Sequence, residues 1–127
     1  MKAYDLCPCC SGKNYFSCCQ LAHLNHSKAC SAEALMRSRY SAFALRNGEY
    51  LMMTTHSSEQ KYHSKKDYLV WATQNEWFKL EIINAQDNIV EFKALYHNQE
   101  KVLCVHHERS TFTYEDGFWY YVDGIFL

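Results

Sequence analysis

Trp77-Phe78-Lys79-Leu80-Glu81-Ile82-Ile83-Asn84-Ala85 is the segment at which the hydrophobic pattern of this chain changes from a helical to an alternating period. Its apolar residues alternate with Lys79 and Glu81, as in a strand with one buried face. Further downstream, Asp116-Gly117 is a strong hairpin signal. The pattern predicts four strands, over residues 77–85, 89–96, 102–114 and 118–122. We therefore expect an antiparallel meander in the second half of the chain.

Upstream of this segment, apolar residues repeat at helical spacing. Helices are predicted over residues 32–46, 49–55 and 65–75. In the first of them, Met36, Tyr40 and Phe43 lie at positions i, i+4 and i+7, and Ser31 can cap the N-terminus. The opposite arc of this helix is also largely apolar, so the helix should be mostly buried. Helices followed by a meander indicate an α+β fold, with the helices packed on one face of the sheet.

Length and charge limit the classes of function. The chain has 127 residues, enough for one domain with a short appendage, and a net charge of −1 without a basic run. Dedicated DNA binding is therefore not expected. No apolar run approaches the roughly 20 residues of a membrane span, and residues 1–7 lack the apolar core of a signal peptide. These observations predict a cytoplasmic location. Aromatic residues make up 16%, and core packing explains most of them, with a cavity or partner surface as the alternative.

The cysteines are clustered near the N-terminus. Five of the seven fall within residues 7–19. In a reducing cytosol this clustering favours metal binding over disulfides. Cys7 and Cys9 can supply two ligands from one tight turn, and Cys18-Cys19 can complete a tetrahedral Zn²⁺ site once the chain has reversed. The sequence predicts a structural zinc knuckle over residues 1–22.

Two alternatives to this ligand set remain open. His23 and His26 form a His-x-x-His pair that could replace the last two cysteines. Otherwise these histidines are solvated residues of a linker over 23–31. The other alternative is a group of reactive thiols that hold no metal. His63 and His97 lie in predicted loops and are expected to be exposed.

The cysteine segment Cys7-Pro8-Cys9-Cys10-Ser11-Gly12-Lys13, with Cys18-Cys19, resembles the SEC-C motif, best known from the C-terminal tail of the SecA translocation ATPase. By this resemblance Cys7, Cys9, Cys18 and Cys19 are the zinc ligands. Cys10 stands where the motif usually has glycine and is a bystander. A knuckle of this kind would dock on a protein partner, associated with translocation or with the ribosome.

The resemblance extends through the rest of the chain. Residues 34–43 (ALMRSRYSAF), 107–112 (HERSTF) and 119–124 (WYYVDG) look like corresponding segments of the YchJ-like family of bacterial proteins. The family implies an NTF2-like (cystatin-like) cone over residues 31–127, in which helices lie across a curved antiparallel sheet and enclose a pocket. NTF2-like domains often pair through their sheets, so a homodimer is also an expectation.

A pocket can also be argued from the residues. Arg39 lies within the apolar arc of the first helix and must find a partner, for which Glu108 on the long strand is the natural candidate. Alternation places His106 and Ser110 on the same strand face as Glu108, and His107 on the other. If that face is concave, the cone is lined by Arg39, Glu108, His56 and Trp77.

This pocket has two interpretations. In one, it holds a polar or anionic small ligand, with Arg39 as a clamp and Glu108 or His56 as a base. In the other, Arg39 and Glu108 form a buried ion pair that only fixes the helix on the sheet. The favoured function is therefore a zinc-containing binding module with a ligand pocket. The alternative is a small NTF2-like hydrolase or isomerase with a polar site around Arg39 and Glu108.

Overall fold

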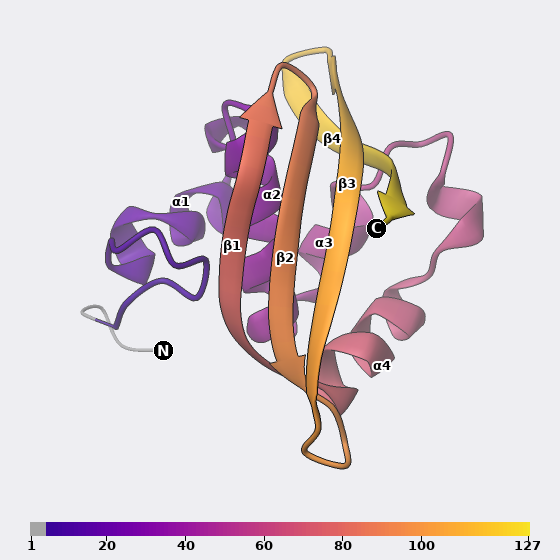
Figure 1. The fold of residues 1–127 in the computed structure, drawn as a ribbon. Coiled ribbons are helices and arrows are strands. Elements are labelled where there is room, and N and C mark those ends of the chain that lie inside the picture. Colours follow the sequence, from indigo (N-terminus) through magenta and orange to yellow (C-terminus); the bar gives the residue numbers. More distant parts are fainter. Residues whose placement is uncertain (1–4) are drawn as a thin grey trace.

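A computed structural model describes residues 5–127 of the chain. Residues 1–4 of the predicted knuckle segment lie outside the described residues. Helices lie behind one face of a single four-stranded sheet, and the cysteine-rich segment lies beside them (Figure 1). The helices are α1 (Cys19–Leu24), α2 (Ala32–Ala44), α3 (Gly48–Met53) and α4 (Lys65–Gln74). Short 3₁₀ helices span Tyr15–Ser17, His26–Lys28 and Gln60–Tyr62. The strands are β1 (Glu76–Gln86), β2 (Ile89–His97), β3 (Leu103–Glu115) and β4 (Phe118–Phe126).

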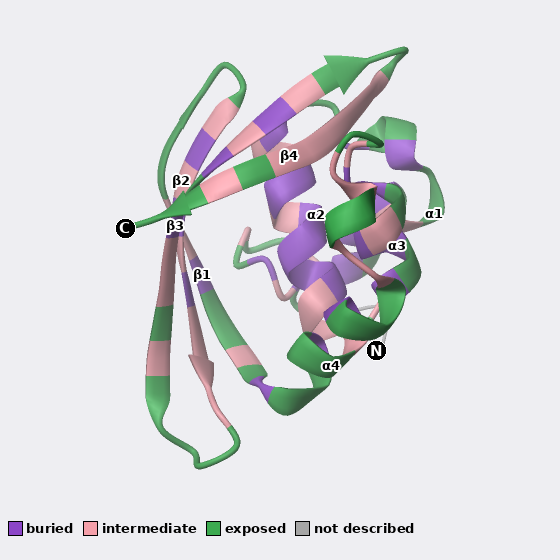
Figure 2. Cartoon of the chain, turned by 90° about the vertical axis from the view of Figure 1, so that its right-hand side faces the viewer, coloured by how far each residue is buried: buried purple, intermediate pink, exposed green. Residues whose placement is uncertain are grey.

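The sheet is a simple antiparallel meander in the order β1-β2-β3-β4, as the alternating pattern predicts. The turns of its hairpins contain residues with a positive φ, including Asp87, Lys101 and the pair Asp116 and Gly117. The pairing register shifts twice between β1 and β2 and once between β3 and β4. Such irregularities bend strands and increase their twist. The sheet is accordingly curved, and its β3–β4 end reaches over the helices (Figure 2).

Helix α2 is the centre of the helical layer. It begins at the predicted cap, where Ser31 Oγ accepts a hydrogen bond from the Ala34 N–H at 3.0 Å. Figure 2 shows α2 largely buried between the sheet and the other helices. Leu35 and Ala42 are fully buried, and Tyr40 is 2% exposed. The helix is buried on most of its circumference because apolar residues occupy much of it and the buried polar residues Ser38 and Arg39 have hydrogen-bond partners within the protein.

The knuckle and the cone share one hydrophobic core. Cys9 and Cys19 belong to the same cluster of buried side chains as Leu35, Leu51 and Phe112. The cysteine segment is therefore packed onto the cone rather than tethered to it. Among residues 5–127, no helix is both long enough and apolar enough to cross a membrane.

The segment over residues 23–31 is not a linker, in contrast to the sequence-based prediction. It contains the end of α1 and a 3₁₀ turn, and Ala29 is buried. The ring of His23 lies between Tyr15 Oη, at 2.7 Å from Nδ1, and the carbonyl of Ser38, at 2.8 Å from Nε2. His26 is 8% exposed and donates from Nε2 to the carbonyl of Trp119 at 2.6 Å. Both histidines thus fasten the knuckle to the cone.

Candidate functional site: a cysteine cluster beside an aromatic cavity

Four cysteine sulfurs converge at the N-terminal end of the fold. The Sγ atoms of Cys7, Cys9, Cys18 and Cys19 all lie within 4.8 Å of one another, and Cys9 Sγ is 3.6 Å from Cys18 Sγ. In a tetrahedral site with Zn–S bonds of about 2.3 Å, neighbouring sulfurs are roughly 3.8 Å apart. Three of the four residues are buried. Four cysteines at this spacing fit a closed, structural zinc site with no open coordination position.

A tight loop over residues 7–13 and the 3₁₀ turn Tyr15–Ser17 bring these cysteines together. The Cys7 N–H donates to the carbonyl of Lys13 at 2.8 Å, which closes the first loop, and Gly12 turns the chain at φ +86°. Cys10 has φ +63°, a left-handed conformation that glycine adopts more readily than other residues. Its thiol is exposed and outside the cluster, and its sulfur accepts a hydrogen bond from the Leu80 N–H at 3.5 Å. This backbone conformation explains why glycine suits the position in the SEC-C motif.

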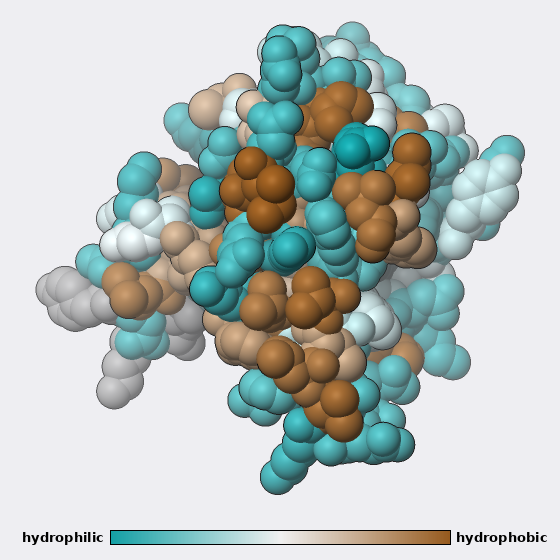
Figure 3. Space-filling view, viewed as in Figure 1, coloured by the Kyte–Doolittle hydropathy of each residue, from teal (hydrophilic) through white to brown (hydrophobic). Residues whose placement is uncertain are grey.

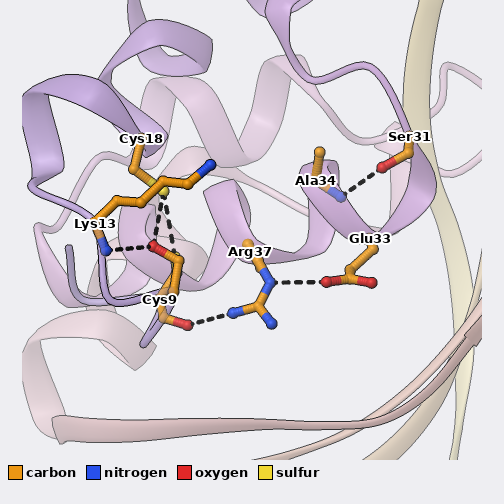
Figure 4. A network of polar contacts seen from close by, with 8 residues as sticks. Cys9, Lys13, Cys18, Ser31, Glu33, Ala34 and Arg37 are labelled. Carbon is orange, nitrogen blue, oxygen red and sulfur yellow. Dashed lines mark hydrogen bonds and ion pairs between the residues drawn. The ribbon is translucent and has the colours of Figure 1, made fainter.

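Residues around the cluster hold it against α2. Ser11 Oγ lies 3.2 Å from Cys18 Sγ, and Ser41 Oγ lies 3.4 Å from Cys7 Sγ. Arg37 on α2 donates from Nη1 to the carbonyl of Cys9 at 2.8 Å and pairs through Nε with Glu33 at 3.0 Å. Figure 4 shows Arg37 between the loop and the first turn of the helix. The loop therefore takes its orientation from α2.

The thiols cannot all ionise together without a cation. Hydrogen bonds with Cys19 and Cys9 lower the pKa of Cys7. A hydrogen bond with Cys19 lowers the pKa of Cys9, but the bond with Cys7 and burial outweigh it and raise that pKa to about 11. Hydrogen bonds with Cys7 and Cys9, together with burial, raise the pKa of Cys19. A divalent cation would lower the pKa of each coordinating thiol, because zinc binds cysteine as the thiolate.

The alternative ligand pair does not suit this geometry. Both ring nitrogens of His23 are engaged, by Tyr15 and by the carbonyl of Ser38. Burial lowers the pKa values of His23 and His26, so both rings are held neutral as internal hydrogen-bonding groups. The expectation of solvated histidines is equally wrong, because the two rings pack against Tyr50 and other aromatic side chains.

A second feature is a cavity of about 360 Å³ between α2, α4 and the concave face of the sheet. Its walls are mainly aromatic. It is lined by Met36, Arg39, Tyr40, Phe43, His63, Tyr68, Trp71, Trp77, Phe92, Ala94, His106, Glu108, Ser110, Tyr121 and Phe126. Three of the four residues predicted to line a pocket, Arg39, Trp77 and Glu108, are therefore brought together.

His56, the fourth, does not line this cavity. It follows α3 and bonds through Nε2 to Glu115 at 2.7 Å and through Nδ1 to Ser58 at 2.8 Å. A backbone hydrogen bond to β4 fixes this position, because the His56 N–H donates to the carbonyl of Tyr121. His63, expected to be exposed, lines the cavity and stacks on Tyr68 with ring centroids 5.4 Å apart.

Arg39 finds partners other than the predicted one. Its Nη1 donates to the carbonyl of Leu51 at 2.9 Å and to Thr54 Oγ1 at 2.7 Å. The guanidinium carbon lies 4.6 Å from the ring centroid of Tyr121. Among the described residues, no ion pair joins Arg39 to Glu108. The ring of Tyr121 lies between them, because its hydroxyl donates to Glu108 at 3.1 Å.

Glu108 is 6% exposed and accepts from three donors. They are His106 Nε2 at 2.7 Å, Tyr121 Oη at 3.1 Å and the hydroxyl of Ser110. Burial alone would raise the pKa of Glu108, but the hydrogen bonds from His106 and Ser110 outweigh it and lower the pKa. The buried carboxylate is therefore ionised at neutral pH.

Gly124 makes room for this carboxylate. A Cβ atom at Gly124 would lie 2.0 Å from Oε2 of Glu108. The sequence-based prediction ended the last strand at residue 122. The structure continues β4 to Phe126 and pairs Gly124 with Ser110. The glycine is in the strand because the carboxylate occupies the space beside it, not because the chain turns there.

The alternation predicted for β3 is confirmed. His106, Glu108 and Ser110 line the cavity, whereas His107 faces the opposite side of the sheet and bonds to Glu91 at 2.9 Å. The sequence reasoning missed the aromatic residues of α4, Tyr68 and Trp71. Their spacing of three residues on a predicted helix was the available signal for a shared face.

A curved antiparallel sheet with helices across its concave side and a cavity between them defines an NTF2-like protein, here with a four-cysteine knuckle. Residues 31–124 match the model of the YchJ middle NTF2-like domain. A UPF0225 protein of Vibrio vulnificus is 39% identical over 94% of this chain and 74% of its own length. A UPF0225 protein of Haemophilus influenzae is 38% identical, over 92% of this chain and 75% of its own length. The chain belongs to this YchJ-like (UPF0225) family.

Two solved structures share the whole arrangement. The solution structure of a SEC-C motif containing protein from Rhodopseudomonas palustris is 32% identical, with a TM-score of 0.84 over 95% of this chain and 98% of its own. The crystal structure of a SEC-C motif containing protein from Psychrobacter arcticus is 29% identical, with a TM-score of 0.76 over 95% of this chain and 82% of its own. Knuckle and cone therefore occur together in these neighbours.

Proposed function

We propose that this protein is a zinc-dependent binding module of the cytoplasm. In this proposal, zinc on Cys7, Cys9, Cys18 and Cys19 holds the knuckle, and the cone receives a small ligand. The observation that carries the proposal is the convergence of the four sulfurs within 4.8 Å beside the shared core. A closed four-cysteine site supplies folding free energy and no chemistry, since it lacks a free coordination position.

Native mass spectrometry with zinc quantification tests the metal part. One zinc ion per chain is expected, lost on mild acidification and absent from Cys9→Ser. Cys10→Ser is the matched control, because Cys10 lies in the same loop with its thiol outside the cluster. A metal-free protein with disulfides among the first five cysteines would contradict the proposal.

We propose that the outer side of the knuckle contacts a protein partner, associated with translocation or with the ribosome. Apolar side chains support this, because Leu6, Leu21 and Leu24 are 67%, 49% and 78% exposed. Leu21 and Leu24 lie three residues apart on α1, and neighbouring exposed apolar residues are typical of interaction surfaces. Cosedimentation with purified ribosomes is the test, comparing wild type with the Leu21→Ser, Leu24→Ser double variant. Val70→Ser, on α4 away from the knuckle, is the control.

An enzymatic role has weaker support. A hydrolase or isomerase that used Glu108 as a base would need a carboxylate with a raised pKa, whereas hydrogen bonds lower it here. Arg39 is 4% exposed and its Nη1 is already bonded. These groups are better suited to shape and polarise a receptor than to move protons.

A further inference from the structure

Tyr40 Oη and Trp77 Nε1, on two residues that line the cavity, have no hydrogen-bond partner within the described part of the chain but are buried. His106 Nδ1 is an unpaired polar atom of the cavity wall on a side chain that is partly exposed. His106 Nε2 lies 2.7 Å from Oε1 of Glu108. An ionised carboxylate can only accept, so in the neutral form of the imidazole Nε2 carries the proton and Nδ1 has the lone pair. Nδ1 makes no hydrogen bond with any of residues 5–127. The His106 side chain lines the cavity and is 25% exposed, so this acceptor is within reach of a ligand.

The charged groups of the cavity already have hydrogen-bond partners within the protein. Glu108 accepts from His106, Ser110 and Tyr121. The guanidinium of Arg39 donates to backbone and hydroxyl oxygens and lies over the Tyr121 ring. A charged ligand would lose its hydration and would have to compete with the hydrogen bonds that these charged groups already make. An anion would also lie near the carboxylate, and a cation near the guanidinium. The cavity therefore favours an uncharged ligand.

The walls favour a flat ring. Trp71 and Trp77 meet edge to face with centroids 5.8 Å apart, and Phe43 lies 5.7 Å from Trp77. On the β4 side, Phe126 contacts the ring of His106 at 5.1 Å. Aromatic pairs contribute about 0.5–1.5 kcal/mol beyond the burial of their area. A volume of about 360 Å³ is at the small end of the range of ligand pockets.

We propose that the cavity binds an uncharged, planar aromatic or heteroaromatic molecule whose N–H or O–H donates a hydrogen bond to Nδ1 of His106. Glu108 acts as a positioning residue that holds the imidazole in the required tautomer. Gly124 makes space for that carboxylate. This inference rests on the proposed receptor function of the cone and specifies its ligand class.

Two isomeric probes isolate the hydrogen bond. 3-Methylindole keeps the ring N–H, whereas 1-methylindole has the same atoms with the N–H blocked. Isothermal titration calorimetry of the full zinc-loaded chain should give an affinity for 3-methylindole at least about tenfold higher. Indole-2-carboxylate, an anionic analogue, should bind more weakly than 3-methylindole. Shifts in the indole ¹⁵N–¹H signals of Trp71 and Trp77 should locate the binding in the cavity, while that of Trp119 stays unchanged.

Neighbouring histidines on β3 provide matched variants. In His106→Leu the affinity ratio of the two isomers should fall to about one. In His107→Leu, on the opposite face of the same strand, it should stay as in wild type. If His106→Leu does not fold, Glu108→Gln tests the same point, because the amide no longer fixes the tautomer and the ratio should fall.

The outcomes separate this inference from the function on which it rests. Equal affinity for the two isomers, or a preference for the carboxylate, overturns the inference and leaves a receptor of another specificity. Absence of binding by all three probes also overturns the inference. The receptor function itself fails if neither aromatic nor aliphatic small molecules, charged or neutral, shift the signals of Trp71 and Trp77 in the zinc-loaded chain.

Discussion

At the scale of single residues, two positions depend on what a Cβ atom would meet or require. Gly124 admits a carboxylate, and Cys10 has a left-handed backbone in a loop whose family motif usually has glycine. Neither constraint follows from hydrophobicity. At both positions, adding or removing a Cβ atom should change the free energy of unfolding measurably.

Gly124→Ala should destabilise the fold by more than about 2 kcal/mol, since the new methyl overlaps the carboxylate of Glu108. Urea denaturation measures the free energy of unfolding. The Glu108→Ala, Gly124→Ala double variant should lose less than the sum of the single losses, because the methyl then has space. Additive losses would show that the two groups do not compete for it.

Cys10→Gly should stabilise the protein by up to about 1 kcal/mol, because glycine adopts a positive φ without the steric cost of Cβ. Chemical denaturation of the zinc-loaded form is the measurement. Cys10→Ala removes the same thiol but keeps Cβ, so it should bring no such gain. Equal stability of the glycine and alanine variants would contradict the strain argument.

At the scale of elements, the junction between α1 and the cone depends on neutral histidines. His26 lies under the end of the sheet and donates to the carbonyl of Trp119. Burial lowers its pKa, more than the hydrogen bond to Trp119 raises it, and the charge of Arg39 lowers it further. The junction is therefore an element whose stability depends on pH.

The sign of this dependence follows from the lowered pKa. As the pH falls, the unfolded chain takes up the proton first, at its ordinary pKa of about 6.5. The stabilisation by His26 is therefore present above pH 6.5 and is lost as the pH falls through the folded-state value. Between pH 8 and 5.5, the free energy of unfolding measured by denaturation should fall less for His26→Gln than for the wild type. Glutamine can donate to the same carbonyl but does not titrate. An identical pH profile would contradict this role, since acid release of zinc affects both proteins alike.

At the scale of the whole molecule, the shared core predicts that metal and cone unfold together. Cys9 and Cys19 pack in one cluster with Leu35 and Phe112. Removal of zinc by a chelator should lower the Tm of the cone by roughly 10 °C or more. Near-UV circular dichroism of the cavity tryptophans follows the cone directly. A cone that keeps its Tm without metal would show that the knuckle is an independent unit.

The outer face of the sheet is the expected site of pairing between two copies. Figure 3 shows apolar side chains gathered over the lower part of this face. Phe78, near the start of β1, and Leu103 and Val105, at the start of β3, are 45%, 57% and 53% exposed. We propose that two copies pair through this face, in which case the Leu103→Lys, Val105→Lys double variant should be monomeric. Sedimentation velocity over a range of concentrations is the measurement. A monomeric wild type at all concentrations would contradict the pairing.

Local pattern was sufficient for α2, α3 and α4, for the order of the four strands and for the grouping of cysteines, but it missed α1 and ended β4 at residue 122. The alternation after Trp77 predicts the sheet order, and the helical spacing around Tyr40 predicts α2. The short spacing between Cys7 and Cys19 predicts the cluster. Each of these rests on residues close in sequence, whose geometry the backbone period dictates.

Only the tertiary structure decided how distant residues share space. It placed Tyr121 between Arg39 and Glu108, turned His23 and His26 into internal contacts, and kept His56 out of the cavity. The physical reason is that a buried polar group needs a hydrogen-bond partner but many candidates can provide one. Packing of helix on sheet selects among them, and a one-dimensional pattern contains no information about that choice.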